Sequence, residues 1–415
     1  MTAHPSEARA SCASELESAY AWARLGTALL LGTIGGVSMW SVAVTLLEVQ
    51  GTFGVTRNEA SLSYTLAMLG FGAGGVVIGR MVDRWGVMRP VIGAIVVLSL
   101  GYVAAGSATS FWQFALASGL LIGFGGAATF GPLMADTSQW FDRHRGIAIT
   151  VCASGNYLAG TVWPEVLEHF IDVAGWRATY IGIGLFCLAT MLPLMLMLRR
   201  PPPRHHDAAA TRAGIRGGTL GLRPNVLLAV LCVAGLACCT AMSMPQVHLI
   251  AYCGDLGYGV GPGAAMLSLM MFFGMVSRIG SGFVADAIGG LGTLLLGSAL
   301  QGVALALYLG FDGLSSLYVI SALFGLFQGG IVPSYAIIVR EYFPPEEAGW
   351  RVGVVLLATL IGMAWGGWMS GEVFDLTGSY HAAFANGLAW NLLNGAIALY
   401  LLRRRRGWPA APVTA

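Results

Sequence analysis

One charged residue stands alone inside a long apolar segment and points most clearly to binding chemistry. Arg278 is the only charged residue in the segment 262–285. It precedes Asp286 by eight residues, which places it roughly 12 Å inside the segment if the segment is helical. A guanidinium at that depth in hydrocarbon requires water, a counter-charge or an anionic ligand. Because it can bind a carboxylate through two parallel hydrogen bonds, we expect it to bind a small organic anion.

Four further polar side chains interrupt apolar segments and are candidates to line a solute pathway. Tyr64, Asn156 and Tyr335 carry hydrogen-bonding groups, and binding pockets combine apolar walls with a few such groups. Hydrogen bonding between neighbouring helices is the alternative role for each. His248 has a side chain that ordinarily titrates near neutral pH, so it is the candidate for proton coupling or for hydrogen bonding to the solute. Its alternative role is that of a satisfied polar group near the end of its segment.

The segments that position these residues are long and apolar. Hydrophobic residues make up 56% of the 415 residues and charged residues only 10%, against ~25% charged in soluble domains. Runs of ~20 apolar residues, each able to cross ~30 Å of hydrocarbon, recur along the chain. We therefore predict an all-α membrane protein with twelve transmembrane helices, at 24–48, 60–82, 89–108, 112–136, 146–170, 176–198, 226–251, 262–285, 291–309, 315–339, 350–372 and 381–402.

The distribution of arginines predicts the orientation. The chain has no lysine, so arginines supply all 22 basic residues. With the spans above, Arg57 and Arg177 fall on one side and nearly all the others on the opposite side. The arginine-rich side is expected to be cytoplasmic. The expected protein is multi-pass, lies in the cell inner (plasma) membrane, and has both termini in the cytoplasm.

The predicted spans form two related halves. The expected organisation is a cytoplasmic tail at 1–23, a six-helix bundle at 24–198, a cytoplasmic linker rich in proline and arginine at 199–225, a second six-helix bundle at 226–402 and a cytoplasmic tail at 403–415. The first tail lacks the apolar core of a signal peptide. Two pseudo-symmetric bundles around a midplane site are the architecture of many secondary transporters.

A short pattern of glycine and aspartate repeats between the halves. Gly79, Asp83 and Gly86 follow the second span, and Gly282, Asp286 and Gly289 stand at the same spacing after the eighth. A carboxylate there can bind the exposed amides at a neighbouring helix start and is stabilised by its dipole. Apart from Gly289, these residues are, with Arg84 and Arg89, the candidates for a cytoplasmic gate. The alternative is that the charges only set the topology.

The repeated loops, the six-plus-six layout and the basic linker resemble the major facilitator superfamily over essentially the whole chain. Finer motifs resemble its monocarboxylate transporter and oxalate/formate antiporter branch. These are Phe53–Arg57, Arg145–Ala148 after Trp140 and Phe141, Pro245–Tyr252 with Asp255, and Phe374–Tyr380. The resemblance implies the major facilitator fold, a carboxylate-binding arginine at Arg278 and a gate latch in the loop after the second span.

The sequence departs from that branch in two ways. Gly274 stands where the animal members carry an acid one turn before the arginine. The chain also lacks the lysine that the animal members carry on span one and the oxalate exchanger on span eleven. The resemblance therefore does not extend to the proton-coupling scheme of the animal members. Because one cation neutralises one carboxylate, monocarboxylates are favoured over dicarboxylates.

The expected function is secondary active transport of small organic anions by alternating access, coupled to a proton or an exchanged anion. One alternative is an exporter of a neutral or cationic molecule, with Arg278 structural; another is a transporter-like membrane sensor that binds solute without moving it. No nucleotide-binding loop, metal-binding cysteine and histidine spacing or convincing catalytic set occurs in the sequence. We therefore expect no enzyme activity, cofactor, metal, nucleic acid or obligate protein partner, and a monomer suffices.

Overall fold

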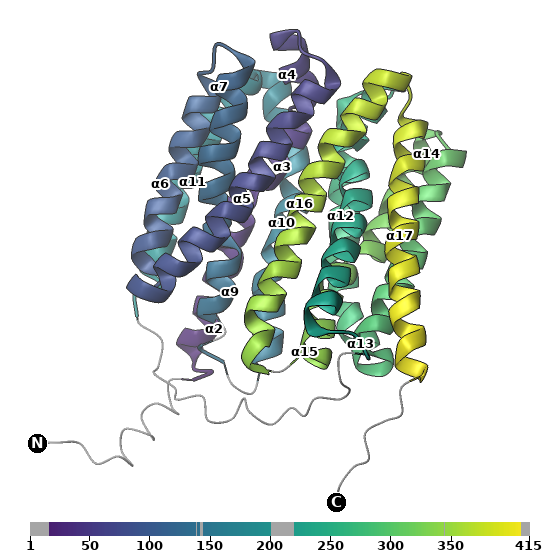
Figure 1. Ribbon diagram of the computed structural model, residues 1–415. Coiled ribbons are helices and arrows are strands. Elements are labelled where there is room, and N and C mark those ends of the chain that lie inside the picture. The colour runs from purple at the N-terminus through teal and green to yellow at the C-terminus, as the bar shows by residue number, and fades with distance from the viewer. Residues whose placement is uncertain (1–15, 138, 142–143, 201–219, 344, 408–415) are drawn as a thin grey trace, which may run out of the picture. The chain divides into compact units, whose positions relative to one another are not determined.

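The computed structural model describes residues 16–137, 139–141, 144–200, 220–343 and 345–407, and α-helices dominate them (Figure 1). The helices before residue 200 are α2 (Ala19–Gly35), α3 (Val37–Val44), α4 (Leu46–Phe53), α5 (Arg57–Trp85), α6 (Met88–Gly106), α7 (Phe111–Leu116), α8 (Phe124–Gly126), α9 (Gly131–Thr137), α10 (Arg145–Ala174) and α11 (Trp176–Leu196). The later helices are α12 (Pro224–Asp255), α13 (Val260–Gly310), α14 (Leu314–Gln328), α15 (Ile331–Tyr342), α16 (Pro345–Thr377) and α17 (Tyr380–Gly407).

The membrane class predicted from the sequence is confirmed by the helices. Among the described residues, 10 helical stretches are long and apolar enough to cross a membrane. The predicted fifth and twelfth spans fall on α10 and α17, which are helical but more polar. Glu165 and Glu168 lie within α10, and Asn391 and Asn394 lie within α17. These side chains lower the hydropathy of the two helices without interrupting them.

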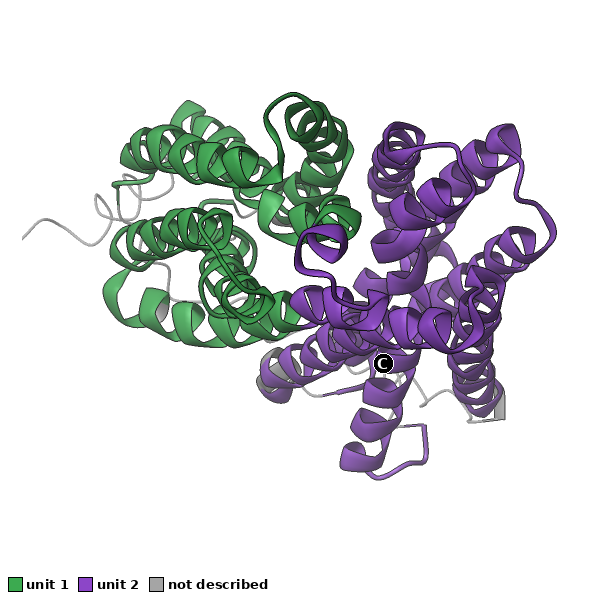
Figure 2. Ribbon diagram, turned by 90° about the horizontal axis from the view of Figure 1, so that it is seen from above, with its two compact units in different colours: residues 1–48, 66–207 green, residues 49–65, 208–415 purple. Residues whose placement is uncertain are grey.

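The chain divides into two compact units (Figure 2). Unit 1 comprises residues 1–48 and 66–207, and unit 2 comprises residues 49–65 and 208–415. Helix α5 therefore starts in unit 2 and continues into unit 1, a feature that the sequence did not predict. Of the expected tails and linker, residues 1–15, 201–219 and 408–415 lie outside the described residues.

The fourth span of each half is a broken helix. In unit 1 a π-helical turn at Ala117–Gly123 and a 3₁₀ turn at Ala127–Thr129 precede a non-helical residue, Phe130, with φ −119° and ψ −87°. In unit 2 the irregularity is milder: Gly329 (φ −59°, ψ −30°) and Gly330 (φ −87°, ψ −12°) separate α14 from α15 but keep right-handed helical backbone angles. Pro132 and Pro333 follow the two breaks, in the first turn of the next helix, where proline removes no intrahelical hydrogen bond.

The repeated glycines have a conformational cause. Gly86 follows α5 with φ +76°, and Gly289 turns the backbone inside α13 with φ +79°. Residues with a side chain rarely adopt this left-handed region, whereas glycine enters it without steric cost. Gly289 thus separates the predicted eighth and ninth spans, and the corresponding turn ends the second span.

Unit 1 contains a buried ion pair near the beginning of α2. Arg24 is 1% exposed and donates from Nη2 to Asp136 Oδ1 at 2.8 Å and from Nε to Asp136 Oδ2 at 2.9 Å. The guanidinium also lies 4.8 Å from the ring centroid of Trp140. This two-bond geometry offsets much of the cost of burying the two charges.

Candidate solute-binding and gating residues

Arg278 lies on α13, half-buried, beside the helix break of unit 2. A methyl group added to Gly329 would lie 3.0 Å from the Arg278 backbone nitrogen and 2.8 Å from Ser277 Cβ. The break therefore packs directly on the turn that carries Arg278. A half-buried arginine in an otherwise apolar helical segment is an arrangement suited to an anion.

A second polar site lies elsewhere in unit 2, where the chain from α5 meets α12, α16 and α17. We call it the outer polar cluster. It comprises Arg57, Asn58, His248, Asp255, Glu372, Asp375 and Tyr380.

Asp375 caps the start of α5 from another helix. Its Oδ1 accepts a hydrogen bond from the Arg57 backbone nitrogen at 3.2 Å, and its Oδ2 accepts one from the Asn58 nitrogen at 2.6 Å. These two amides have no intrahelical partner in a first turn, and a negative charge there is favoured by the helix dipole. The Asn58 side chain also donates to Glu372. The beginning of α5 is thus bound to α16 by two carboxylates.

The Arg57 side chain is the centre of the cluster and is only 4% exposed. Its Nη1 donates to the Tyr380 hydroxyl at 2.6 Å, and its Nη2 lies 3.3 Å from both carboxylate oxygens of Asp255. The guanidinium carbon is 4.9 Å from the ring centroid of Phe374, which itself stacks on Tyr380. Arg57 therefore joins three helices by charge, hydrogen bonds and ring contact.

His248 extends the cluster into α12 and is fully buried. Its Nε2 lies 2.8 Å from the Gly367 carbonyl oxygen, which can only accept, so Nε2 carries the proton. Its Nδ1 lies 3.2 Å from the Tyr380 hydroxyl. Because that hydroxyl accepts from Arg57, it can donate its own proton to Nδ1. The hydrogen bonds thus form a chain from Arg57 through Tyr380 and His248 to Gly367.

The other three candidate binding residues occupy separate places. Tyr64 packs on the same glycine as His248, because a methyl group added to Gly367 would lie 2.8 Å from Tyr64 Cδ1. Tyr335 is fully buried and donates to Asn394 Oδ1 at 2.8 Å, which is a bond between helices of one unit. Asn156 belongs to unit 1, where its side-chain oxygen is buried without a hydrogen-bond partner among the described residues.

The predicted cytoplasmic gate is described only in part. The backbone at Asp83 and Asp286 is helical, but their side chains lie outside the described residues. Arg84 is exposed, with its guanidinium carbon 5.9 Å from the Trp85 ring centroid, and Arg89 is exposed as well. Gly79 and Gly282 each have open space where a side chain would be. The gating role of these residues stays a prediction.

Sequence reasoning missed Asp255, Glu372, Asp375 and Tyr380 as functional candidates and treated Arg57 only as a topology marker. A usable signal was present: three of the motifs that carried the family resemblance contain Arg57, His248 with Asp255, and Asp375 with Tyr380. These motifs meet in one cluster although Arg57 and Tyr380 are 323 residues apart in the chain.

Comparisons with known proteins agree with the fold. The family model described as Major Facilitator Superfamily matches residues 28–311 and 282–415. Monocarboxylate transporter 13 of Bos taurus is 28% identical over 336 residues, covering 79% of this chain and 76% of the relative. The MFS-type transporter pynF of Aspergillus niger is 23% identical over 384 residues, covering 90% and 88%.

Among solved structures, a bacterial homologue of the human lysosomal transporter Spinster, in an inward-facing and unoccupied conformation, superposes with a TM-score of 0.75. The sequence identity is 14%, and the superposition covers 95% of this chain and 99% of the other. At that identity the likeness shows the fold alone. Since the family model covers both halves of the chain, this protein belongs to the Major Facilitator Superfamily and is an integral membrane transporter rather than an enzyme.

Proposed function

We propose that this protein is a secondary active transporter of small organic anions, most simply monocarboxylates, with Arg278 binding the carboxylate. The observation that carries the proposal is the position of Arg278, the one charged residue of the segment 262–285, half-buried on α13. A guanidinium at such a position favours a negative ligand. Relatives named monocarboxylate transporters support this substrate class.

The size of the charge favours one carboxylate over two. A single arginine neutralises one carboxylate, and a second one in a low-dielectric site would remain without a counter-charge. We therefore infer that lactate-sized monoanions bind better than oxalate or succinate. Uptake of the dicarboxylates, but not of the monoanions, into proteoliposomes that contain the protein would contradict this inference.

Binding is tested by a thermal-shift screen of detergent-purified protein against carboxylates, amines and neutral solutes. A ligand that binds only the folded state raises its apparent melting temperature, by an amount that grows with concentration over Kd. We expect carboxylates to raise it for the wild type and for Arg340→Gln, an exposed arginine used as the control, but not for Arg278→Gln. Carboxylate shifts that persist in Arg278→Gln would exclude the proposed role.

The same screen and one transport assay separate the alternatives. Binding of neutral or cationic solutes that survives Arg278→Gln would favour the exporter, with Arg278 structural. Counterflow of labelled solute in proteoliposomes distinguishes a transporter from a sensor that binds without moving solute. His248 remains the candidate for proton coupling. If the pH dependence of uptake is the same in His248→Gln as in the wild type, His248 does not have that role.

We further propose that the outer polar cluster is a lock in the alternating-access cycle. Residues 57–65 of α5 group with unit 2, whereas residues 66–85 of the same helix group with unit 1. The lock would hold the start of α5 on unit 2 through Arg57, Asp375 and Tyr380, and breaking it would let that helix end leave. Membrane carriers change state by such exchange of discrete contacts.

Cysteine labelling tests the lock. Ser61 is fully buried and donates to the Asn58 backbone oxygen at 2.9 Å, so a cysteine introduced there as Ser61→Cys should react slowly with a membrane-impermeant maleimide. We expect Tyr380→Phe to speed that reaction and Tyr258→Phe, which alters a hydrogen bond outside the cluster, to leave it unchanged. The chain without the Ser61→Cys substitution gives the background rate of labelling. Equal rates in all backgrounds would show that the cluster does not control this helix end.

A further inference from the structure

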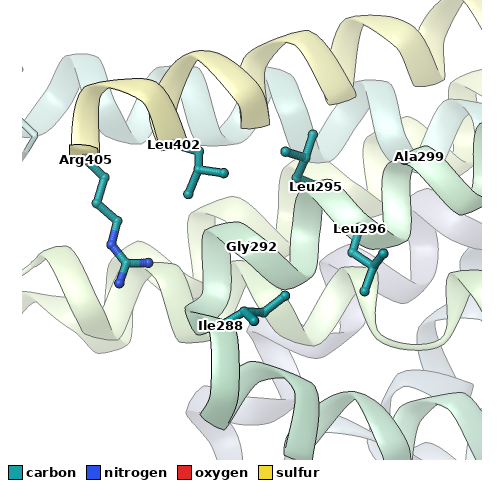
Figure 3. A pocket seen from close by; sticks show the side chains of 7 residues that line it. All are labelled: Ile288, Gly292, Leu295, Leu296, Ala299, Leu402 and Arg405. Carbon is teal, nitrogen blue, oxygen red and sulfur yellow. The ribbon is translucent and has the colours of Figure 1, made fainter. Parts of the chain in front are cut away.

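Unit 2 contains a second feature that neither Arg278 nor the outer polar cluster uses, a groove between α13 and α17 (Figure 3). Its volume is about 710 Å³, within the ~300–1,000 Å³ range of ligand pockets. Six of the residues that line it are apolar: Ile288, Gly292, Leu295, Leu296, Ala299 and Leu402. Such a lining suits a hydrocarbon chain.

One cation stands at the end of this groove. Arg405 lines it from the last turn of α17, in the arginine run 403–406 that the charge distribution predicts to be cytoplasmic. Its Nη1 lies near the turn that begins the second part of α13, because a methyl group added to Gly289 would be 2.9 Å from it. The groove therefore joins an apolar wall at membrane depth to a guanidinium at the expected membrane surface.

The Glu341 carboxylate lies beside the same turn, since a methyl group added to Gly289 would be 3.6 Å from its Oε1. Glu341 Oε1 accepts a hydrogen bond from the Gly290 backbone nitrogen at 3.0 Å, which directs it to the helix start. Within the described ranges, the ion pairs of at most 4.0 Å do not include Arg405. Arg405 is also exposed. Its donors are available to an anionic group from outside the protein.

We propose that this groove binds an anionic phospholipid, with an acyl chain against α13 and α17 and the phosphate on Arg405. The bilayer supplies this occupant at high local concentration, and basic pockets between membrane helices bind acidic headgroups. A soluble phosphate would leave the apolar wall unused, and a zwitterionic lipid carries an ammonium that Arg405 repels. The charge at one end of the groove and the apolar wall along the rest of it therefore select the same ligand.

The proposal can be tested by native mass spectrometry of delipidated protein in detergent. The probes are phosphatidylglycerol, phosphatidylcholine with the same acyl chains, and glycerol phosphate. The wild type should retain phosphatidylglycerol in preference to the other two. Arg405→Gln should weaken that binding about tenfold, which corresponds to ~1.4 kcal/mol. The matched control is Arg403→Gln, an exposed arginine two residues earlier that does not line the groove, and it should bind like the wild type.

A second variant tests the apolar wall without changing charge. Ala299 is exposed in the groove, so Ala299→Phe fills the space without disturbing the core and should lower phosphatidylglycerol binding. Equal loss in Arg403→Gln and Arg405→Gln would overturn the proposal, as would equal binding of phosphatidylcholine. Binding of glycerol phosphate alone would reassign the site to a soluble anion. A dimer that excludes lipid and dissociates in Ala299→Phe would assign the groove to a second copy of the chain.

Discussion

Arg57 donates from Nη1 to the Tyr380 hydroxyl at 2.6 Å, and this contact joins the first turn of α5 to the first turn of α17. The same hydroxyl lies 3.2 Å from His248 Nδ1. A single phenol oxygen therefore connects a buried cation to a buried imidazole. The contact makes the outer polar cluster a network rather than a set of separate pairs.

Removal of that oxygen should be costly. Tyr380→Phe leaves a guanidinium donor buried without its acceptor, which we expect to destabilise the protein by about 1–3 kcal/mol. The apparent melting temperature in detergent measures the loss. Tyr258→Phe is the control, since its hydroxyl donates to the Asp312 carbonyl at 3.1 Å in an exposed place. Equal shifts in the two variants would show that the cluster adds no stability.

The cap on α5 predicts a smaller effect. Asp375→Ala removes the acceptor for two first-turn amides and should cost about 1 kcal/mol, as loss of a helix cap usually does. Asp375→Asn keeps one acceptor oxygen and should cost less. In the labelling assay above, both variants should speed the reaction of the cysteine in Ser61→Cys. Asp375→Ala should speed it more than Asp375→Asn. The reverse order would contradict a capping role.

The buried pair in unit 1 predicts a strongly non-additive response. Asp136→Asn leaves the Arg24 guanidinium buried without its counter-charge, and we expect a loss of about 3–5 kcal/mol. The double variant Arg24→Met with Asp136→Leu removes both charges and should recover most of that loss. The free energies of unfolding of Arg24→Met, Asp136→Leu and the double variant give the coupling free energy. A double variant as unstable as the sum of the singles would contradict a direct ion pair.

Replacement by alanine should have opposite effects on stability at Gly86 and Gly79. Gly86→Ala forces a side chain into φ +76°, which should cost roughly 1–2 kcal/mol although no atom lies within 4 Å of the added methyl group. Gly79 lies inside α5 with equally open space, so Gly79→Ala should be neutral or stabilising, since alanine is the better helix former. Thermal stability of the two variants checks the contrast. Equal destabilisation would point to packing instead of backbone conformation.

The amino-acid sequence alone was enough to establish the membrane class and the helical character of the long apolar segments. These features depend on local properties. A run of apolar residues must satisfy its own backbone hydrogen bonds in lipid, so it becomes a helix whatever its neighbours are. The spacing of Gly79, Asp83 and Gly86 could likewise be compared with its copy directly. Arg278 could be selected because a charge in an apolar run is costly in any arrangement.

Only the tertiary structure brought Arg57 together with Asp255 and Tyr380 and showed that the start of α5 groups with unit 2. It also located the helix break at Gly329 beside Arg278. The physical reason is that hydropathy and periodicity describe each helix by itself. Which faces of α5, α12, α16 and α17 meet depends on side-chain fit and hydrogen bonds between residues hundreds of positions apart, and no local pattern contains that information.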